Sequence, residues 1–142
     1  MSLNVVYTTS AIAVGGRDGN TGTTDGGFEV KLARPKELAG KGDGNNPEQL
    51  FASGYAASFL SSMQFLASHG EVTVPANAEV MATVGFGPRS EGGLGLEIAL
   101  DITLPGVARR EAEALIKKAY QICAYSNATR NNVAVTLGLI EA

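Results

Sequence analysis

Few side chains in this sequence could act as nucleophiles, acids or bases. The 142-residue chain contains one cysteine, Cys123, and one histidine, His69. A catalytic serine needs an adjacent base. The serine of interest, Ser58, lies in a segment that reads as helix, and His69 is eleven residues further along it, about 16 Å away at the helical rise. The G-x-S-x-G turn of the α/β-hydrolases is also absent. A Ser–His hydrolase is therefore disfavoured, and the simplest interpretation of Ser58 is a small residue that lets another helix approach closely.

Cys123 is expected near the end of a second helix, in the stretch QICAYSNATRNN. Free cysteines are commonly buried and inert. A helix C-terminus tends to raise a thiol pKa, which is the opposite of activation. Cys123 by itself is therefore predicted to be a poor first-attack thiolate. A single cysteine and a single histidine also disfavour a zinc site with nitrogen and sulfur ligands, so neither a metal nor a cofactor is expected.

Two charged residues stand next to turn or cap signals. Arg17 lies in the turn sequence GGRDG, where a solvated arginine is the common outcome, and Glu48 would complement the dipole at the start of a helix. The loop 40–46, GKGDGNN, could present backbone N–H groups to an anion. It lacks the G-x-x-x-x-G-K-[ST] pattern of a nucleotide site, so a flexible connector is the preferred interpretation.

Composition disfavours nucleic-acid-binding, disulfide-linked, secreted and membrane-spanning proteins. The chain is 44% hydrophobic and 18% charged with a net charge of −3, so it offers no basic stripe for nucleic acid. A lone cysteine cannot form an internal disulfide. The N-terminal sequence MSLNVVYTTS has no signal-peptide pattern, which makes a cytoplasmic location the default expectation. The segment 50–68 is uncharged but has too many serines for a membrane span.

The pattern along the chain predicts one α+β domain over residues 1–142 with antiparallel sheet. Residues 4–14 and 28–33 are expected to be strands that pair across a long turn. A helix is expected over 47–69, with Asn46 as its N-cap and Gln49 completing a capping box.

The second half should consist of two strands, a helix and a last strand. The strands 71–89 and 93–106 are expected to be joined by the turn SEGG, and 132–140 closes the chain. The helix is expected over 109–126. Its apolar face would comprise Leu115, Ile116, Ala119, Ile122 and Cys123.

The helix at 47–69, which carries no charge over residues 50–68, has too little cover in so small a protein. A second copy of the chain would supply that cover, so a homodimer with this helix in its interface is predicted. The alternative is a monomer whose sheet wraps the helix.

Three stretches together resemble a known family. GGRDG, NPEQLFASGYAASF and ICAYSNATRNN are similar, in order and spacing along the whole chain, to those of the organic hydroperoxide resistance proteins of the OsmC/Ohr family. The resemblance implies an intertwined α+β homodimer with two active sites at the interface. It also implies a thiol peroxidase that reduces organic hydroperoxides, including fatty-acid hydroperoxides, and is recycled by a lipoylated protein or another dithiol.

The resemblance assigns roles to four residues. Arg17 matches the arginine of the peroxide site, Glu48 matches the glutamate that pairs with it, and Cys123 matches the resolving cysteine. Ser58 stands where the family has its peroxidatic cysteine. Two smaller departures are Ala124, where proline is usual, and Asn131, where glycine is frequent.

The departure at Ser58 implies that the chain keeps its fold and pocket but lacks turnover, because a hydroxyl does not ionise near neutral pH. The serine reads as an engineered replacement, with a natural variant as the alternative. Glu48 and Ser58 would lie about 15 Å apart along one helix and roughly 80° apart around it. Chain packing across the dimer is therefore expected to bring an Arg17–Glu48 pair to Ser58.

Two alternative functions are also compatible with the sequence. One is a non-catalytic protein that binds a lipid or acyl ligand in the same pocket, with candidate wall residues Phe51, Phe59, Met63 and Phe65. The other is the osmotically induced OsmC branch, which shares the chemistry. The stretches NPEQLFASGYAASF and YSNATR favour the organic hydroperoxide branch.

Overall fold

A computed structural model describes residues 2–70 and 72–141. It divides into two compact units, the first ending at Leu50 and the second beginning at Phe51. Residues 47–68 form one helix, α1, that starts in the first unit and continues in the second.

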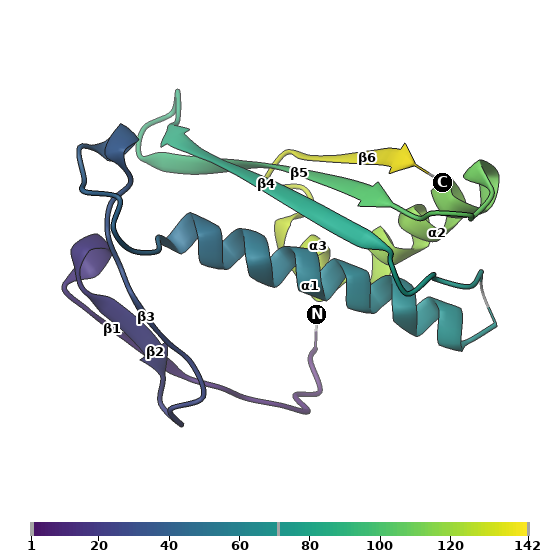
Figure 1. Cartoon of the computed structure of the whole chain (residues 1–142), viewed down its shortest axis with the longest axis horizontal. Helices are drawn as coiled ribbons and strands as arrows, with labels where there is room; N and C mark the ends of the chain where they lie inside the picture. Colours follow the sequence, from purple (N-terminus) through teal and green to yellow (C-terminus); the bar gives the residue numbers. More distant parts are fainter. Residues whose placement is uncertain (1, 71, 142) are drawn as a thin grey trace. The chain divides into compact units, whose positions relative to one another are not determined.

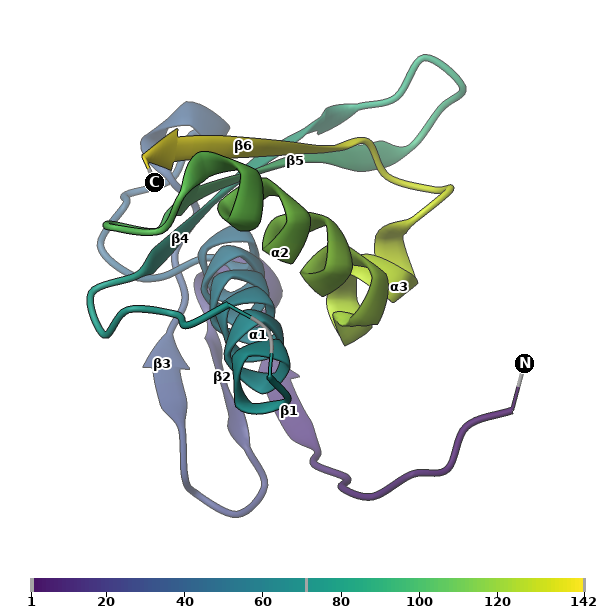
Figure 2. The ribbon, with the colours of Figure 1, turned by 90° about the vertical axis from the view of Figure 1, so that its right-hand side faces the viewer.

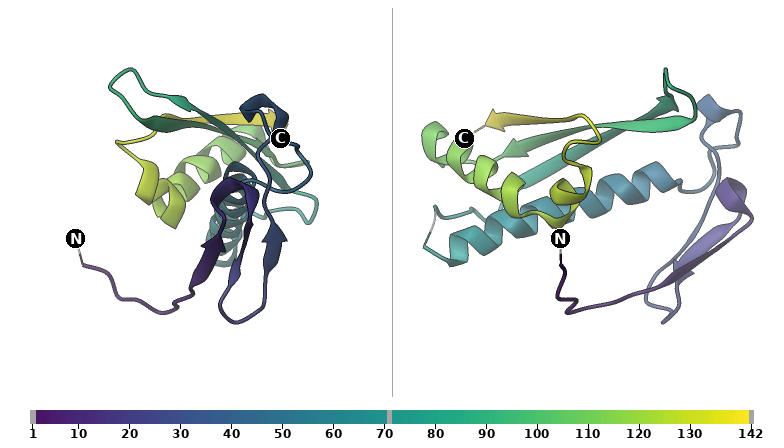
Figure 3. Two further views of the ribbon diagram at one scale, coloured as in Figure 1. Left: turned by 90° about the vertical axis from the view of Figure 1, so that its left-hand side faces the viewer. Right: turned by 180° about the vertical axis from the view of Figure 1, so that it is seen from behind.

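The first unit contains a three-stranded antiparallel sheet in the order β1-β2-β3 (Figure 1). The strands are β1 (Ala11–Val14), β2 (Asn20–Thr23) and β3 (Glu29–Lys31), and two 3-10 turns, η1 (Gly16–Asp18) and η2 (Lys36–Leu38), follow β1 and β3. In Figure 3 the long N-terminal segment runs into β1 without regular structure.

The predicted hairpin of 4–14 with 28–33 is wrong in its pairing. β2 lies between the two expected strands, in a segment whose glycine, asparagine and aspartate content predicted only a turn. Gly22 shows why glycine occurs inside this strand, since a Cβ there would lie 2.7 Å from the carbonyl oxygen of Phe28. Close approach of the neighbouring strand, and not chain reversal, requires this glycine.

The predicted start of α1 (Pro47–Ser68) is confirmed. The Gln49 amide N–H donates to Asn46 Oδ1 at 2.9 Å, and the Asn46 amide N–H donates to Gln49 Oε1 at 3.0 Å. These reciprocal bonds satisfy two backbone donors and fix the first turn of the helix. The helix ends one residue before the predicted boundary at His69.

The second unit contains a mixed sheet in the order β4-β5-β6. β4 (Glu79–Pro88) and β5 (Leu94–Thr103) are antiparallel as predicted, whereas β6 (Val135–Glu141) runs parallel to β5. The predicted strand 71–89 begins only at Glu79. Its first residue, Glu71, lies outside the described residues, and 72–78 contain no strand.

The single helix predicted over 109–126 is wrong. The chain forms α2 (Arg109–Ile122) and a separate short α3 (Ala124–Thr129), with Cys123 between them at φ −64° and ψ 125°. An extended residue cannot continue the helix, so the chain changes direction there (Figure 3, right). The Arg130 guanidinium stacks 4.5 Å from the Tyr120 ring and donates to the Tyr120 carbonyl oxygen. These contacts hold the end of α3 against α2.

Both long helices cover the same face of the sheet (Figure 2). Tyr55, Phe59 and Met63 follow one another at four-residue steps and are fully buried. They pack in one cluster with Leu100 and Ala119, among others. Of the predicted apolar face of α2, Ile122 is the exception, because it is 42% exposed just before the break. The expected α+β class is confirmed.

Candidate functional site

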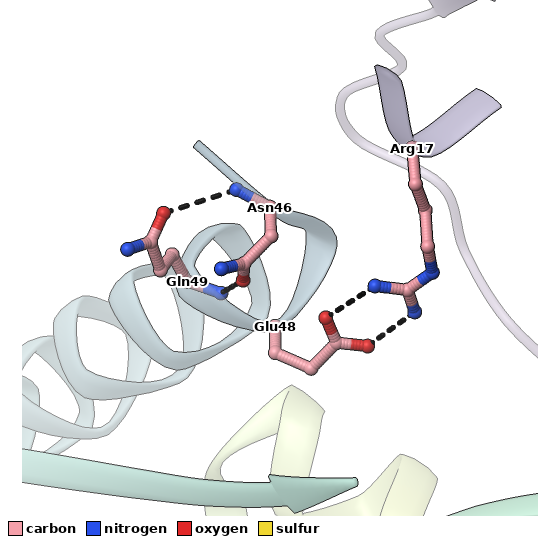
Figure 4. A network of polar contacts seen from close by, with 4 residues as sticks. All are labelled: Arg17, Asn46, Glu48 and Gln49. Carbon is pink, nitrogen blue, oxygen red and sulfur yellow. Dashed lines mark hydrogen bonds and ion pairs between the residues drawn. The ribbon is translucent and has the colours of Figure 1, made fainter. Parts of the chain in front are cut away.

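In the first unit, Arg17 and Glu48 form a two-pronged ion pair (Figure 4). Arg17 Nη1 donates to Glu48 Oε2 at 2.8 Å, and Nη2 donates to Oε1 at 2.6 Å. η1 presents the arginine after a turn in which Gly15 and Gly16 have φ of 81° and 58°. The capping box fixes the helix turn that carries Glu48. Both side chains are largely shielded, with exposed fractions of 27% and 17%, and the fork geometry fixes the plane of the guanidinium.

The pair has a clear electrostatic consequence. The hydrogen bonds from Arg17 hold the pKa of Glu48 below its ordinary value despite partial burial. In return, the hydrogen bond and charge of Glu48 raise the pKa of Arg17. The site therefore holds a carboxylate and a guanidinium that are both charged at neutral pH.

In the second unit, Ser58 of α1 lies beside Cys123. The distance from Ser58 Oγ to Cys123 Sγ is 3.6 Å, although the residues are 65 positions apart. Cys123 is completely buried, whereas Ser58 is partly exposed. The predicted shared site of Ser58 and Cys123 requires this proximity. Ser58, which lies far from His69 along the helix, is thus in contact with the single thiol of the chain.

The expectation that a helix end raises the thiol pKa is wrong. Burial does raise the pKa of Cys123, but hydrogen bonds from the Ser126 amide, the Ser58 and Ser126 hydroxyls and the Tyr125 amide outweigh it, so the net pKa is lowered. The break in the helix places Cys123 both at the end of α2 and at the N-cap position of α3, although its thiol makes no side-chain capping hydrogen bond.

A buried hydroxyl cluster next to the thiol was missed by the sequence analysis. Tyr55 Oη lies 2.6 Å from Ser126 Oγ and 3.5 Å from Thr129 Oγ1. All three residues are buried. Two signals could have indicated it: a tyrosine in the buried stripe of α1 needs a polar partner, and Ser126 and Thr129 are spaced to share one helical face.

His69 and the predicted wall residues lie in ordinary structural environments. His69 is exposed and its ring lies 4.3 Å from that of Phe65, itself 55% exposed. Of the candidate wall residues, Phe59 and Met63 belong to the core and Phe51 packs at its edge. Within residues 2–70 and 72–141, no group of three or more His, Cys, Asp and Glu side chains could hold a metal ion.

No helix in the described part of the chain is both long and apolar enough to cross a membrane.

Comparison with known proteins identifies the family of the chain. A family model described as OsmC-like protein matches residues 40–138. The organic hydroperoxide resistance protein of Xanthomonas axonopodis pv. citri is 45% identical over 136 residues, which cover 95% of each chain. The organic hydroperoxide resistance protein OhrA of Bacillus subtilis is 40% identical over 96% of this chain and 97% of its own.

A solved structure gives the same result. The organic hydroperoxide resistance protein of Vibrio cholerae, described with captopril bound in one of its active sites, superposes with a TM-score of 0.92 at 40% identity. The match covers 98% of this chain and 95% of the other. The chain therefore belongs to the OsmC/Ohr family and is similar to its organic hydroperoxide resistance proteins.

Proposed function

We propose that this protein is built as a thiol peroxidase for organic hydroperoxides, including those of fatty acids, with Ser58 in the position of the attacking sulfur and Cys123 as the resolving thiol. The observation that carries the proposal is the 3.6 Å contact between Ser58 Oγ and Cys123 Sγ. An attacking sulfur and its resolving partner must be this close for a disulfide to form after small movements. The family membership and the names of the relatives support the reaction class.

With a cysteine at position 58, the chemistry proceeds in three steps. The thiolate attacks the terminal peroxide oxygen, the O–O bond breaks, and the alkoxide takes up a proton and leaves as an alcohol. The resulting sulfenic acid is attacked by Cys123, which forms a disulfide and releases water. A dithiol, proposed here to be a lipoylated protein, then reduces the disulfide with two electrons.

Arg17 and Glu48 are proposed to serve the first step. A guanidinium favours a thiolate over a thiol and stabilises negative charge on the departing oxygen. Glu48 acts through Arg17, because its two oxygens fix the guanidinium plane at 2.8 and 2.6 Å.

A homodimer is proposed to complete the site. Apolar residues of the N-terminal segment and first sheet are exposed in the single chain, namely Leu3, Val5, Val6, Tyr7, Ile12 and Val14. Burial of these side chains by a second copy would remove a large apolar surface from water. The helical spacing of Glu48 and Ser58 given above favours a site that draws on two subunits.

Serine at position 58 blocks the cycle at its first step, since its hydroxyl does not ionise near neutral pH and cannot form a sulfenic acid. We therefore expect Ser58→Cys to consume cumene hydroperoxide when a lipoylated protein or dihydrolipoamide is supplied, while the chain with serine does not. Ser61→Cys is the matched control, because it places a thiol on an exposed position of the same helix. Equal activity of the Ser58→Cys and Ser61→Cys variants would refute the proposal. So would co-purified lipid together with an inactive Ser58→Cys variant, the result expected of a binding protein.

The roles of Arg17 and Glu48 need a second experiment. In the Ser58→Cys background, a mixed dimer with Arg17→Ala in one subunit and Glu48→Gln in the other retains one intact ion pair only if the pair forms between subunits. Because the structure pairs the two residues within one chain, neither subunit keeps an intact pair, and we expect both sites to be impaired. A half-active mixed dimer would contradict the pairing within one chain.

A further inference from the structure

The short helix α3 is tied to α1 by a buried pair of hydroxyl groups. Tyr55 Oη lies 2.6 Å from Ser126 Oγ, and neither side chain has any exposed surface. Thr129 Oγ1 lies 3.5 Å from the same phenol oxygen. Because buried hydroxyls have no water with which to exchange partners, their hydrogen bond holds the two helices in one relative position.

This hydroxyl pair lies beside the contact between positions 58 and 123. Tyr55 precedes Ser58 by three residues on α1, and Ser126 follows Cys123 by three residues in the first turn of α3. Residues three apart on a helix lie on the same side. The two contacts, of 2.6 Å and 3.6 Å, are therefore neighbouring bridges between the same two segments. Only the second bridge would become covalent with a sulfur at position 58.

Ring contacts support the hydroxyl pair. The Tyr125 ring lies 5.9 Å from the Tyr55 ring, and a Cβ on Gly54 would meet a carbon of the Tyr125 ring at 3.4 Å. Ring surfaces can slide over each other at little cost, whereas a hydrogen bond has a narrow range of distance and angle. The bond from Tyr55 to Ser126 is therefore the contact that sets where α3 lies along α1.

Cys123 needs such support because it lies at a junction. Its backbone is extended between α2 and α3, with φ −64° and ψ 125°. The buried side chains of α2 anchor the chain on one side of this junction, and the hydroxyl pair anchors it on the other. Disulfide formation tolerates little error, since the sulfur atoms must come to about 2 Å with a restricted torsion. A small displacement of α3 would therefore take the thiol out of bonding geometry.

We propose that Tyr55 and Ser126 are positioning residues for the resolving step, and that their hydrogen bond keeps Cys123 within reach of a sulfur at position 58. This inference rests on the proposed function, because the step follows peroxide reduction. In it, the Cys123 sulfur bonds to the sulfenic sulfur at position 58 as the S–O bond breaks, and the hydroxyl group leaves with the thiol proton as water. Tyr55 and Ser126 exchange neither protons nor electrons in this step.

The first test measures how readily the disulfide closes in the absence of peroxide. The Ser58→Cys variant is equilibrated with reduced and oxidised glutathione. Closing the protein disulfide converts one oxidised glutathione into two reduced molecules, so the equilibrium gives the effective concentration of the two protein thiols. We expect Tyr55→Phe and Ser126→Ala in this background each to lower the effective concentration about three- to tenfold, through loss of one hydrogen bond. An unchanged value in either variant would overturn the inference.

Combining the two substitutions tests whether they act through one bond. The double variant with Tyr55→Phe and Ser126→Ala should have the effective concentration of the single variants, because the bond can be lost only once. A loss equal to the product of the two single effects would overturn the inference.

Met63→Ala is the control, since it removes a fully buried side chain of α1 outside the pair. It should destabilise the fold and leave the effective concentration unchanged. An equal loss in the control would assign the effect to general destabilisation and refute the positioning role.

The fate of the sulfenic acid gives a second measurement. In the Ser58→Cys variant, the sulfenic acid either closes to the disulfide or reacts with a second hydroperoxide to form sulfinic acid. At a fixed concentration of cumene hydroperoxide, Tyr55→Phe should raise the ratio of sulfinic acid to disulfide about three- to tenfold. Peptide mass spectrometry measures this ratio, and the rate of the first attack should fall by less. An unchanged ratio would contradict the inference.

The two measurements separate failure of the positioning role from failure of the proposed function. If the Ser58→Cys variant consumes no hydroperoxide, the proposed function is refuted. The glutathione equilibrium requires no peroxide, so it still decides whether Tyr55 and Ser126 position Cys123.

Discussion

Replacement of Glu48 by glutamine removes the acceptor charge from the Arg17 pair while keeping the size of the side chain. Hydrogen bonds to charged groups contribute about 1.5–3 kcal/mol. Glutamine can still accept one of the two N–H groups, and both residues retain some solvent contact, with exposed fractions of 27% and 17%. We therefore expect Glu48→Gln to lower the free energy of unfolding by about 1–2 kcal/mol at pH 7, less than the loss from breaking a fully buried pair.

The same substitution should change how stability depends on pH. The folded-state pKa of Glu48 lies below its ordinary value of 4.5, so the folded protein binds fewer protons there than the unfolded chain. The stabilisation is complete above 4.5 and is lost as the pH falls through the lower folded-state pKa. The difference between the unsubstituted chain and Glu48→Gln should therefore be largest near neutral pH and should shrink in acid.

Urea denaturation from pH 7 to pH 3 measures both effects. Glu29→Gln removes the same charge at an exposed position of β3 and is the control. It should change the free energy of unfolding by less than about 0.5 kcal/mol. If Glu48→Gln destabilises the protein equally at pH 7 and pH 3, the cost arises from packing and the electrostatic argument is refuted.

Two other substitutions test the elements that position the site. Phe59→Ala should cost about 3–5 kcal/mol in unfolding free energy, because the ring is fully buried between α1 and the sheet; a loss below 1 kcal/mol in urea denaturation would contradict this packing. Asn46→Ala should cost about 1 kcal/mol, because it removes the acceptor for the Gln49 amide. The measurement is the same, and an unchanged midpoint would show that the capping box does not stabilise α1.

The elements that the sequence predicted well are those whose signals are local. Asn46, Pro47 and Gln49 fixed the start of α1 because a capping box involves only backbone groups within one turn. β4 and β5 were predicted as an antiparallel pair, because a short turn joins two strongly β-forming runs. The Arg17–Glu48 ion pair was anticipated through the family resemblance, since no local rule pairs residues 31 positions apart.

Two features had no local signal. In β2, two strand-forming threonines alternate with Asn20 and Gly22, which disfavour strands, and the strand is held by its neighbours β1 and β3. The break at Cys123 lies inside a run that has ordinary helix propensity on both sides. Tertiary contacts, including Arg130 with the Tyr120 carbonyl and Tyr55 with Ser126, determine that the helix stops there.

The thiol at the break between α2 and α3 lies beside Ser58. Burial raises the pKa of Cys123, and nearby hydrogen bonding outweighs it, so the pKa is lowered overall. The serine at position 58 contacts Cys123 at 3.6 Å, which is the contact that the proposed cycle requires of an attacking sulfur. A single substitution, Ser58→Cys, is thus a sufficient test, because it supplies the only atom that the proposed cycle lacks at that position.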